Sequence, residues 1–191
     1  MNKWWAGGLL GILTACGGQP LPPLHDAARR DDAAGVTALL KAGADPNYQG
    51  RETNGWTPLM HAIHKRSSRA ATALIEAGAD VNVRGGAGVN ALIMAAGYGE
   101  MDVVRALLTA GADPRAATED GIDAVWSAAG GGAIADITDG PPLGGCFPDT
   151  VAALLEKAPE MRLKKGLETR ALSWLARSVE CRRLLARLQP R

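Results

Sequence analysis

Two short motifs recur about every 33 residues, and this repetition limits the fold more than any other feature of the sequence. The first is an aliphatic pair followed closely by Ala-Gly-Ala-Asp, and it occurs at residues 39–47, 74–82 and 107–115. The second begins with glycine and continues into small and apolar residues, starting at Gly55, Gly88 and Gly121. In an earlier partial copy, Leu24 precedes Leu59 by 35 residues. Motifs that recur in phase at this spacing are typical of solenoids.

The residues within one repeat predict two helices joined by turns. Thr57 is suited to cap the first helix, Pro58 suits its first turn, and the apolar residues after them fall on one face. The second helix carries one apolar stripe, which in residues 103–108 consists of Val103, Val104, Leu107 and Leu108. This helix is expected to end in left-handed glycines, at Gly43, Gly78 and Gly111. A single helix pair cannot bury its own apolar face, so each unit needs neighbours.

This pair of motifs resembles the ankyrin repeat, strongly over residues 23–129 and weakly over 149–189. The resemblance implies an all-α ankyrin-repeat solenoid of about five helix-turn-helix units with short β-turn or hairpin tips. Units 1 to 3 are expected at 23–47, 48–82 and 83–115, with a turn in 48–55 that is longer by two residues. Unit 4 begins at Ala116 but does not reach its second helix until about Asp149. A shortened closing repeat at about 166–189 is expected to act as the C-terminal cap.

Composition agrees with such a core and excludes two classes of protein. The chain of 191 residues is 47% hydrophobic and 21% charged, which is not the profile of a disordered protein. Its formal net charge of +1 argues against a general nucleic-acid binder, which needs excess Lys and Arg. Only 4% of the residues are aromatic, while 24 are glycine. The core is therefore expected to consist of helices packed closely through small and aliphatic side chains.

The first residues have the features of an export signal. Lys3 is the only charge before an apolar stretch that is too short to span a bilayer. The stretch ends in Leu13-Thr14-Ala15-Cys16, which resembles the bacterial lipoprotein signal, in which the cysteine is acylated and becomes the new N-terminus. An ordinary secretory signal with a coincidental cysteine is the alternative. We predict a signal peptide at 1–15 and a membrane anchor on Cys16, with acyl chains that each contribute about 0.8 kcal/mol per buried CH₂.

The segment after Cys16 fits an anchored protein. Residues 16–22 are rich in Gly and Pro and are expected to form a linker that lifts the domain at 23–191 off the membrane. Gly17 follows the cysteine where sorting rules of enteric lipoproteins would place Asp for inner-membrane retention. That resemblance favours the bacterial cell envelope, at the outer membrane facing the periplasm.

An insertion at about 130–148 interrupts unit 4 and is dominated by Gly and Pro, so a loop is predicted there. Cys146 lies near its end, and Cys181 lies in the closing repeat. In an exported protein, two cysteines that remain after lipidation predict a disulfide. The alternative is two free buried thiols. A 146–181 bond would contribute roughly 4 kcal/mol in the chain-entropy model.

Charge is distributed unevenly along the chain. Residues 160–191 hold nine Lys or Arg and three Glu, a net +6, and the remaining mature chain is −6. A solvated closing helix explains this pattern. The alternative is a basic patch for anionic lipid, lipopolysaccharide or an acidic partner.

Few residues could carry chemistry. His61 and His64 are three apart on one helix, a spacing that metal ligands use, but no further Cys, His or paired carboxylate accompanies them. His25 matches the histidine of the ankyrin Pro-Leu-His motif and is expected to be structural. No nucleophile motif, phosphate-binding loop or dinucleotide fingerprint is present. We predict no enzymatic activity, no cofactor and no metal site.

Function is therefore expected to lie in a surface. By the resemblance, partners bind at the turn tips and at the exposed side of the first helix of each unit. Trp56 and Tyr98 are predicted as exposed aromatic anchors, although Trp56 could instead cover a neighbouring turn and Tyr98 could cap a helix. The predicted contact residues are Asn54, Trp56, His64, Lys65, Arg84, Tyr98, Glu119, Asp120 and Ile122.

These patterns predict a monomeric, lipid-anchored envelope protein that binds another protein and no nucleic acid. It would be a scaffold or chaperone of a periplasmic enzyme, or an immunity protein against a periplasmic toxin. The alternative is an envelope lipid or polysaccharide binder that uses the basic C-terminal end.

Overall fold

The computed structural model describes residues 21–130, 146–162 and 179–188, with the side chains of Cys181 and Leu185 excepted. The predicted signal peptide, Cys16, most of the linker, most of the insertion and the first part of the closing repeat lie outside these residues.

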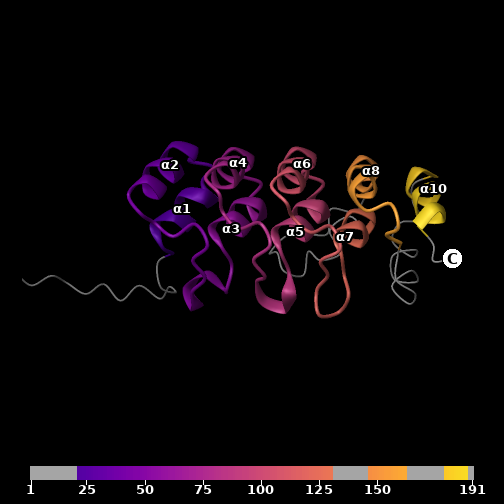
Figure 1. Cartoon of the computed structure of the whole chain (residues 1–191), viewed down its shortest axis with the longest axis horizontal. Coiled ribbons are helices and arrows are strands. Elements are labelled where there is room, and N and C mark those ends of the chain that lie inside the picture. Colours follow the sequence, from indigo (N-terminus) through magenta and orange to yellow (C-terminus); the bar gives the residue numbers. More distant parts are fainter. Residues whose placement is uncertain (1–20, 131–145, 163–178, 189–191) are drawn as a thin grey trace, which may run out of the picture.

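The described helices stand in a single row of pairs (Figure 1). The pairs are α1 (Pro23–Arg29) with α2 (Ala33–Lys41), α3 (Pro58–His64) with α4 (Ser68–Glu76), α5 (Ala91–Tyr98) with α6 (Met101–Thr109), and α7 (Ala124–Gly130) with α8 (Pro148–Lys157). A further helix, α10 (Val179–Leu188), packs against α7 and α8. In the view of Figure 1, α2, α4, α6 and α8 form an upper layer, and α1, α3, α5 and α7 form the layer below it. This arrangement confirms the all-α solenoid.

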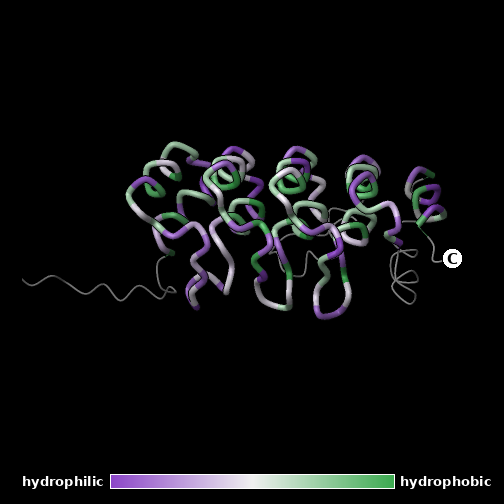
Figure 2. The backbone as a smooth tube through the Cα atoms, in the orientation of Figure 1, coloured by the Kyte–Doolittle hydropathy of each residue, from purple (hydrophilic) through white to green (hydrophobic). Residues whose placement is uncertain are grey.

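Each layer is held by contacts between equivalent helices of neighbouring units. In the lower layer α3 packs between α1 and α5, and α5 between α3 and α7; in the upper layer α4 packs between α2 and α6. Aliphatic residues such as Leu59, Leu92 and Leu107 are fully buried, and so are the small residues Ala62 and Ala95. Hydrophobic residues recur in each pair (Figure 2). The core is therefore built from small and aliphatic side chains, as the composition predicted.

The first helices of units 2, 3 and 4 begin at one capping position, which three different residues fill, whereas α1 follows Pro22 and has no side-chain cap. Thr57 Oγ1 accepts a hydrogen bond from the Met60 amide at 3.3 Å. The Asn90 side chain makes the equivalent bond to Ile93 at 2.9 Å, and the Asp123 side chain makes it to Trp126 at 2.8 Å. All three residue types are good N-caps because a short side-chain oxygen reaches the orphan amides of the first turn.

The second helices end as the glycine pattern predicted. At the end of α2, Gly43 has φ +91° and donates its amide to Leu40, while Ala44 donates to Leu39. This is the Schellman arrangement, and it recurs at Gly78 and Gly111.

An asparagine then connects unit 1 to unit 2, and another connects unit 2 to unit 3. The side-chain oxygen of Asn47 accepts from the Asp80 amide at 2.8 Å, and that of Asn82 accepts from the Asp113 amide at 2.9 Å. At the third equivalent position Arg115 replaces asparagine, and its Nε donates to Glu160 at 2.7 Å. The regular connection therefore ends at unit 3.

Unit 4 is interrupted between α7 and α8, where the insertion was predicted. The chain returns from it at Phe147, whose amide donates to the Ala128 carbonyl at 2.9 Å and whose ring lies against Gly99. Cys146 is disulfide-bonded. Because the side chain of Cys181 is not among those described, the pairing of these two cysteines stays a prediction. Within the described ranges, no helix combines the length and the apolar character needed to cross a bilayer.

Candidate interaction surface

The tips of units 2, 3 and 4 are joined to one another by hydrogen bonds. Gln49 Nε2 donates to the Gly55 carbonyl at 2.7 Å and to the Arg84 carbonyl in the next tip at 2.9 Å. Arg84 Nη1 donates to the Ala117 carbonyl at 2.7 Å, and the Glu119 amide donates to Ala87 at 3.1 Å. The tips therefore form one continuous surface whose backbone is fixed before any partner arrives.

The tips have the turn and hairpin character that the resemblance implied. Antiparallel bridges join Arg84 to Asn90 and Ala117 to Asp123. A short 3₁₀ turn, η1 (Arg51–Thr53), lies in the loop of unit 2, and another, η2 (Gly86–Gly88), lies inside the loop that the Arg84–Asn90 bridge closes. Ala87 has φ +57°, a left-handed conformation that costs a residue with a Cβ roughly 1 kcal/mol.

The predicted contact residues fall into two groups. At the tips, Asn54, Arg84, Glu119 and Asp120 are exposed and Ile122 is half-buried. At the other end of the first helices, Lys65 is exposed, and His64 and Tyr98 are half-buried. A helix of the length of α3 separates these groups by about 10 Å. A partner that contacts both groups would have to lie along the lower layer.

The prediction of Trp56 as an exposed anchor is wrong. Its side chain is only 8% exposed, and its ring packs against His61 and His64. Gly85, in the next tip, lies against the indole and has no side chain to displace it. Trp56 therefore fills the junction between the tips of units 2 and 3, which matches the alternative that it covers a neighbouring turn.

Tyr98 is engaged but not buried. It is the last residue of α5, and its hydroxyl is hydrogen-bonded to His64 Nδ1 at 3.1 Å. Arg66 donates to the Tyr98 carbonyl at 2.7 Å, and its guanidinium lies 5.9 Å from the ring centroid. These contacts orient the ring, so Tyr98 remains a candidate contact residue with a fixed side chain.

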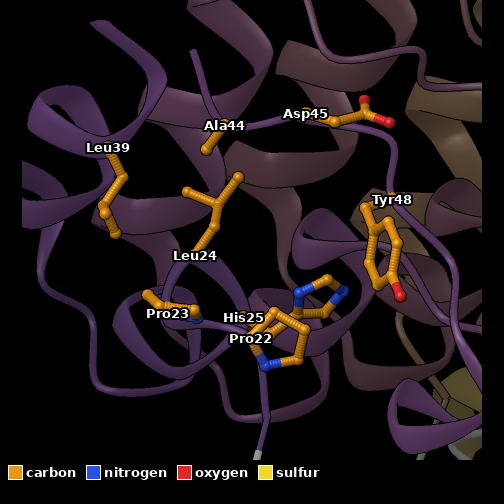
Figure 3. Close-up of a pocket in the computed structure, with 8 residues that line it drawn as sticks. All are labelled: Pro22, Pro23, Leu24, His25, Leu39, Ala44, Asp45 and Tyr48. Atoms are coloured by element: carbon orange, nitrogen blue, oxygen red, sulfur yellow. The ribbon is translucent and has the colours of Figure 1, made fainter. Parts of the chain in front are cut away.

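Tyr48 is an exposed aromatic residue that sequence analysis missed. Its side chain is 42% exposed, and its hydroxyl donates to Glu52 Oε1 at 2.7 Å, which raises the pKa of the tyrosine. It borders a mostly apolar pocket of about 330 Å³ at the N-terminal end of the solenoid. Figure 3 shows Leu39 and Tyr48 on opposite sides of this pocket. The lengthened 48–55 turn was the available signal, because the two extra residues change which side chain the tip displays.

A row of six aromatic and imidazole rings runs from unit 1 to unit 3. Successive ring centroids are 5.2 to 6.4 Å apart, in the order Tyr48, His25, His61, Trp56, His64 and Tyr98. Burial lowers the pKa of His25, and burial lowers the pKa of His61 to about 4. Among the residues that the structure describes, no group of three or more His, Cys, Asp or Glu is arranged to hold a metal ion.

The basic C-terminal end is represented by α10. Arg182, Arg183 and Arg187 are exposed on this helix, and Leu188 is buried. Residues 163–178, which carry other basic residues of the predicted patch, lie outside the described part of the chain.

The family model of ankyrin repeats, in three copies, matches residues 24–118. No curated protein was found to match the sequence. The matched residues include unit 1, the Asn47 and Asn82 connections, and the three joined tips as far as Thr118.

Proposed function

Residues 24–118 of the chain consist of ankyrin repeats. We propose that the protein binds a specific partner protein through the three joined tips and the lower helix layer. Ankyrin repeats generally mediate contacts between proteins. The observation that carries the proposal is the hydrogen bonding between tips, in which Gln49 and Arg84 each reach a carbonyl of the next unit. A surface that is ordered before binding loses little conformational entropy when a partner docks.

Each part of the surface has its own role in the proposal. Asn54, Glu119 and Asp120 present polar groups that select the partner. Tyr48 and the pocket beside it accept an apolar side chain, since a few anchor residues buried in pockets dominate interface energies. Lys65 and Tyr98 extend the contact along the lower layer.

We further propose that this surface works at the bacterial envelope. A signal peptide at 1–15, acylation of Cys16 and a Gly/Pro linker would hold the domain at the outer membrane, facing the periplasm. There it would act as a scaffold or chaperone of a periplasmic enzyme, or as an immunity protein against a periplasmic toxin. The proposed role is binding, with no catalysis and no cofactor. Replacing Cys16 with Ser should move the protein from the membrane to the soluble fraction, and unchanged membrane association would contradict the anchor.

The second candidate function is favoured by one observation, the exposed arginines of α10. In this version Arg182, Arg183 and Arg187 contact anionic lipid or polysaccharide. Changing all three to Gln should abolish binding of the non-acylated protein to anionic vesicles, while capture of a protein partner persists.

Charge reversal at the tips tests the main proposal. We expect Glu119→Lys with Asp120→Lys to reduce capture of the partner from envelope extracts at least tenfold, because a reversed charge meets like charge in the interface. The matched control is Glu76→Lys with Asp102→Lys, which reverses two exposed charges on α4 and α6 in the upper layer. Equal capture by both double variants would contradict binding at the tips.

A further inference from the structure

Two buried histidines hold the tip loop of unit 2, residues 48–57. His25, from α1, has its Nε2 3.1 Å from the Trp56 carbonyl oxygen, and His61, from α3, has its Nε2 3.1 Å from the Thr53 carbonyl oxygen. A carbonyl oxygen can only accept a hydrogen bond, so each ring carries a proton on Nε2. The side chains are 0% and 5% exposed, and the ring centroids are 5.3 Å apart.

The other nitrogen of each ring has no hydrogen-bond partner. Nδ1 of His25 and Nδ1 of His61 are both buried without one. A second proton on His61 would therefore create a buried N–H that lacks an acceptor, next to another imidazole. Such a group is expensive to bury, both as an unpaired donor and as a charge. On His25 the backbone of Tyr48 offsets part of this cost.

Some groups around the two histidines raise their pKa values, and others lower them. Glu52 and the backbone of Tyr48, in the loop, and the Trp56 carbonyl favour the protonated form of His25, but burial outweighs them and lowers its pKa. For His61, burial is again the main cause of the lowered pKa, and positive charge on His25, Arg29 and His64 lowers it further, against the Thr53 carbonyl. The closed loop therefore favours neutral rings over protonated ones.

We propose that His25 and His61 form an acid-sensitive latch on the 48–57 loop. When either ring takes up a second proton, its bond to the loop is retained only at the cost of a buried positive charge, which on His61 also has an unpaired N–H, and the loop leaves its place against α1 and α3. The loop carries Tyr48 and Asn54, so acid would also disorganise one end of the interaction surface. Only this last consequence rests on the proposed function; the latch itself concerns the free protein.

Hydrogen exchange and NMR on the unmodified protein test the latch. Between pH 7 and pH 5, after correction for intrinsic exchange, the opening equilibrium of amides in 48–57 should rise about twentyfold if His61 alone is protonated on opening. Long-range proton–nitrogen spectra at pH 7 should show both rings protonated on Nε2 alone. An unchanged opening equilibrium, or rings protonated on Nδ1, would overturn the proposal.

Variants separate the latch from general acid sensitivity. His25→Gln with His61→Gln keeps neutral donors at both positions and should flatten the pH dependence of loop opening. The matched control is His64→Gln, which changes the half-buried histidine of the same helix and should leave the acid response intact. Circular dichroism at pH 7 shows whether each variant is folded. If the double variant does not fold, the tautomer and hydrogen-exchange measurements on the unmodified protein test the latch. A folded double variant with the full acid response would contradict the latch.

Discussion

The join between units 2 and 3 and the join after unit 3 serve the same purpose with different chemistry. In the first, Asn82 accepts from the Asp113 amide and donates to the Gly111 carbonyl, so one short side chain satisfies two backbone groups of the next unit. In the second, Arg115 reaches Glu160 with a long side chain, and both side chains are 57% exposed. The asparagine fixes the distance between units, whereas the ion pair tolerates a change in spacing and contributes little.

This difference explains where the candidate surface lies. The regular part holds the tips of units 2 and 3 on closely spaced units. Hydrogen bonds, most of them from a side chain to a backbone carbonyl, join these tips to the tip of unit 4. Beyond Arg115, the interruption of unit 4 separates α7 from α8, and the chain returns through Phe147. We therefore expect damage to the regular part to affect the whole solenoid and damage to the C-terminal part to remain local.

Cavity formation should show this contrast most strongly. Leu92, in α5, and Leu154, in α8, are both fully buried leucines. Leu92→Ala should lower the global free energy of unfolding by about 2–5 kcal/mol, because α5 has neighbours on both sides. Leu154→Ala should instead increase hydrogen exchange mainly in α8 and α10, with a smaller change in the urea midpoint. Equal losses of global stability from the two changes would show that the C-terminal part is no less integrated.

Acid should destabilise the N-terminal side of the regular part. The pKa of His61 is about 4 in the folded protein and about 6.5 in the unfolded chain. The unfolded state therefore binds more protons below pH 6.5, and stability falls as the pH is lowered from about 6.5 towards 4. Between pH 7 and 5 we expect a loss of roughly 2 kcal/mol in urea unfolding from this group. His61→Gln should remove most of that loss, and an unaltered pH profile would contradict the assignment.

The two joins can be compared by removing the side chain that makes each of them. Asn82→Ala leaves the Asp113 amide and the Gly111 carbonyl without a protein partner and should cost about 1–2 kcal/mol. Arg115→Ala removes only an exposed ion pair and should cost less than about 1 kcal/mol. Urea unfolding of both variants measures the difference, and a larger loss for Arg115→Ala would reverse our ranking of the joins.

The smallest expected effect is a gain. Ala87→Gly relieves the left-handed conformation at the tip of unit 3, where φ is +57°, and should stabilise the protein by up to about 1 kcal/mol. Asn54 has a similar φ of +55°, but asparagine tolerates it, so Asn54→Gly should change the melting temperature less. A loss of stability in Ala87→Gly would mean that the tip is not strained.

The features that follow from local spacing were predictable from the sequence. The caps at Thr57 and the stops at Gly43 depend on residues within a few positions, so their motifs identify them directly. Trp56 was not predictable in this way, because its burial depends on Gly85 in the next tip and on a bond from His25, which lies 31 residues earlier. Tyr48 was missed for a related reason. The family pattern assigns contact positions by counting along the repeat, and the two extra residues of the lengthened turn change that count.

Photo-crosslinking in intact cells tests partner binding at the tips most directly. One variant carries a photoreactive residue in place of Glu119, in the tip of unit 4. A second variant carries it in place of Asp102, an exposed residue on α6 in the upper layer. Binding through the joined tips predicts a discrete crosslinked species from position 119 and none from position 102. Crosslinking from position 102 alone, or equally from both positions, would contradict the central claim.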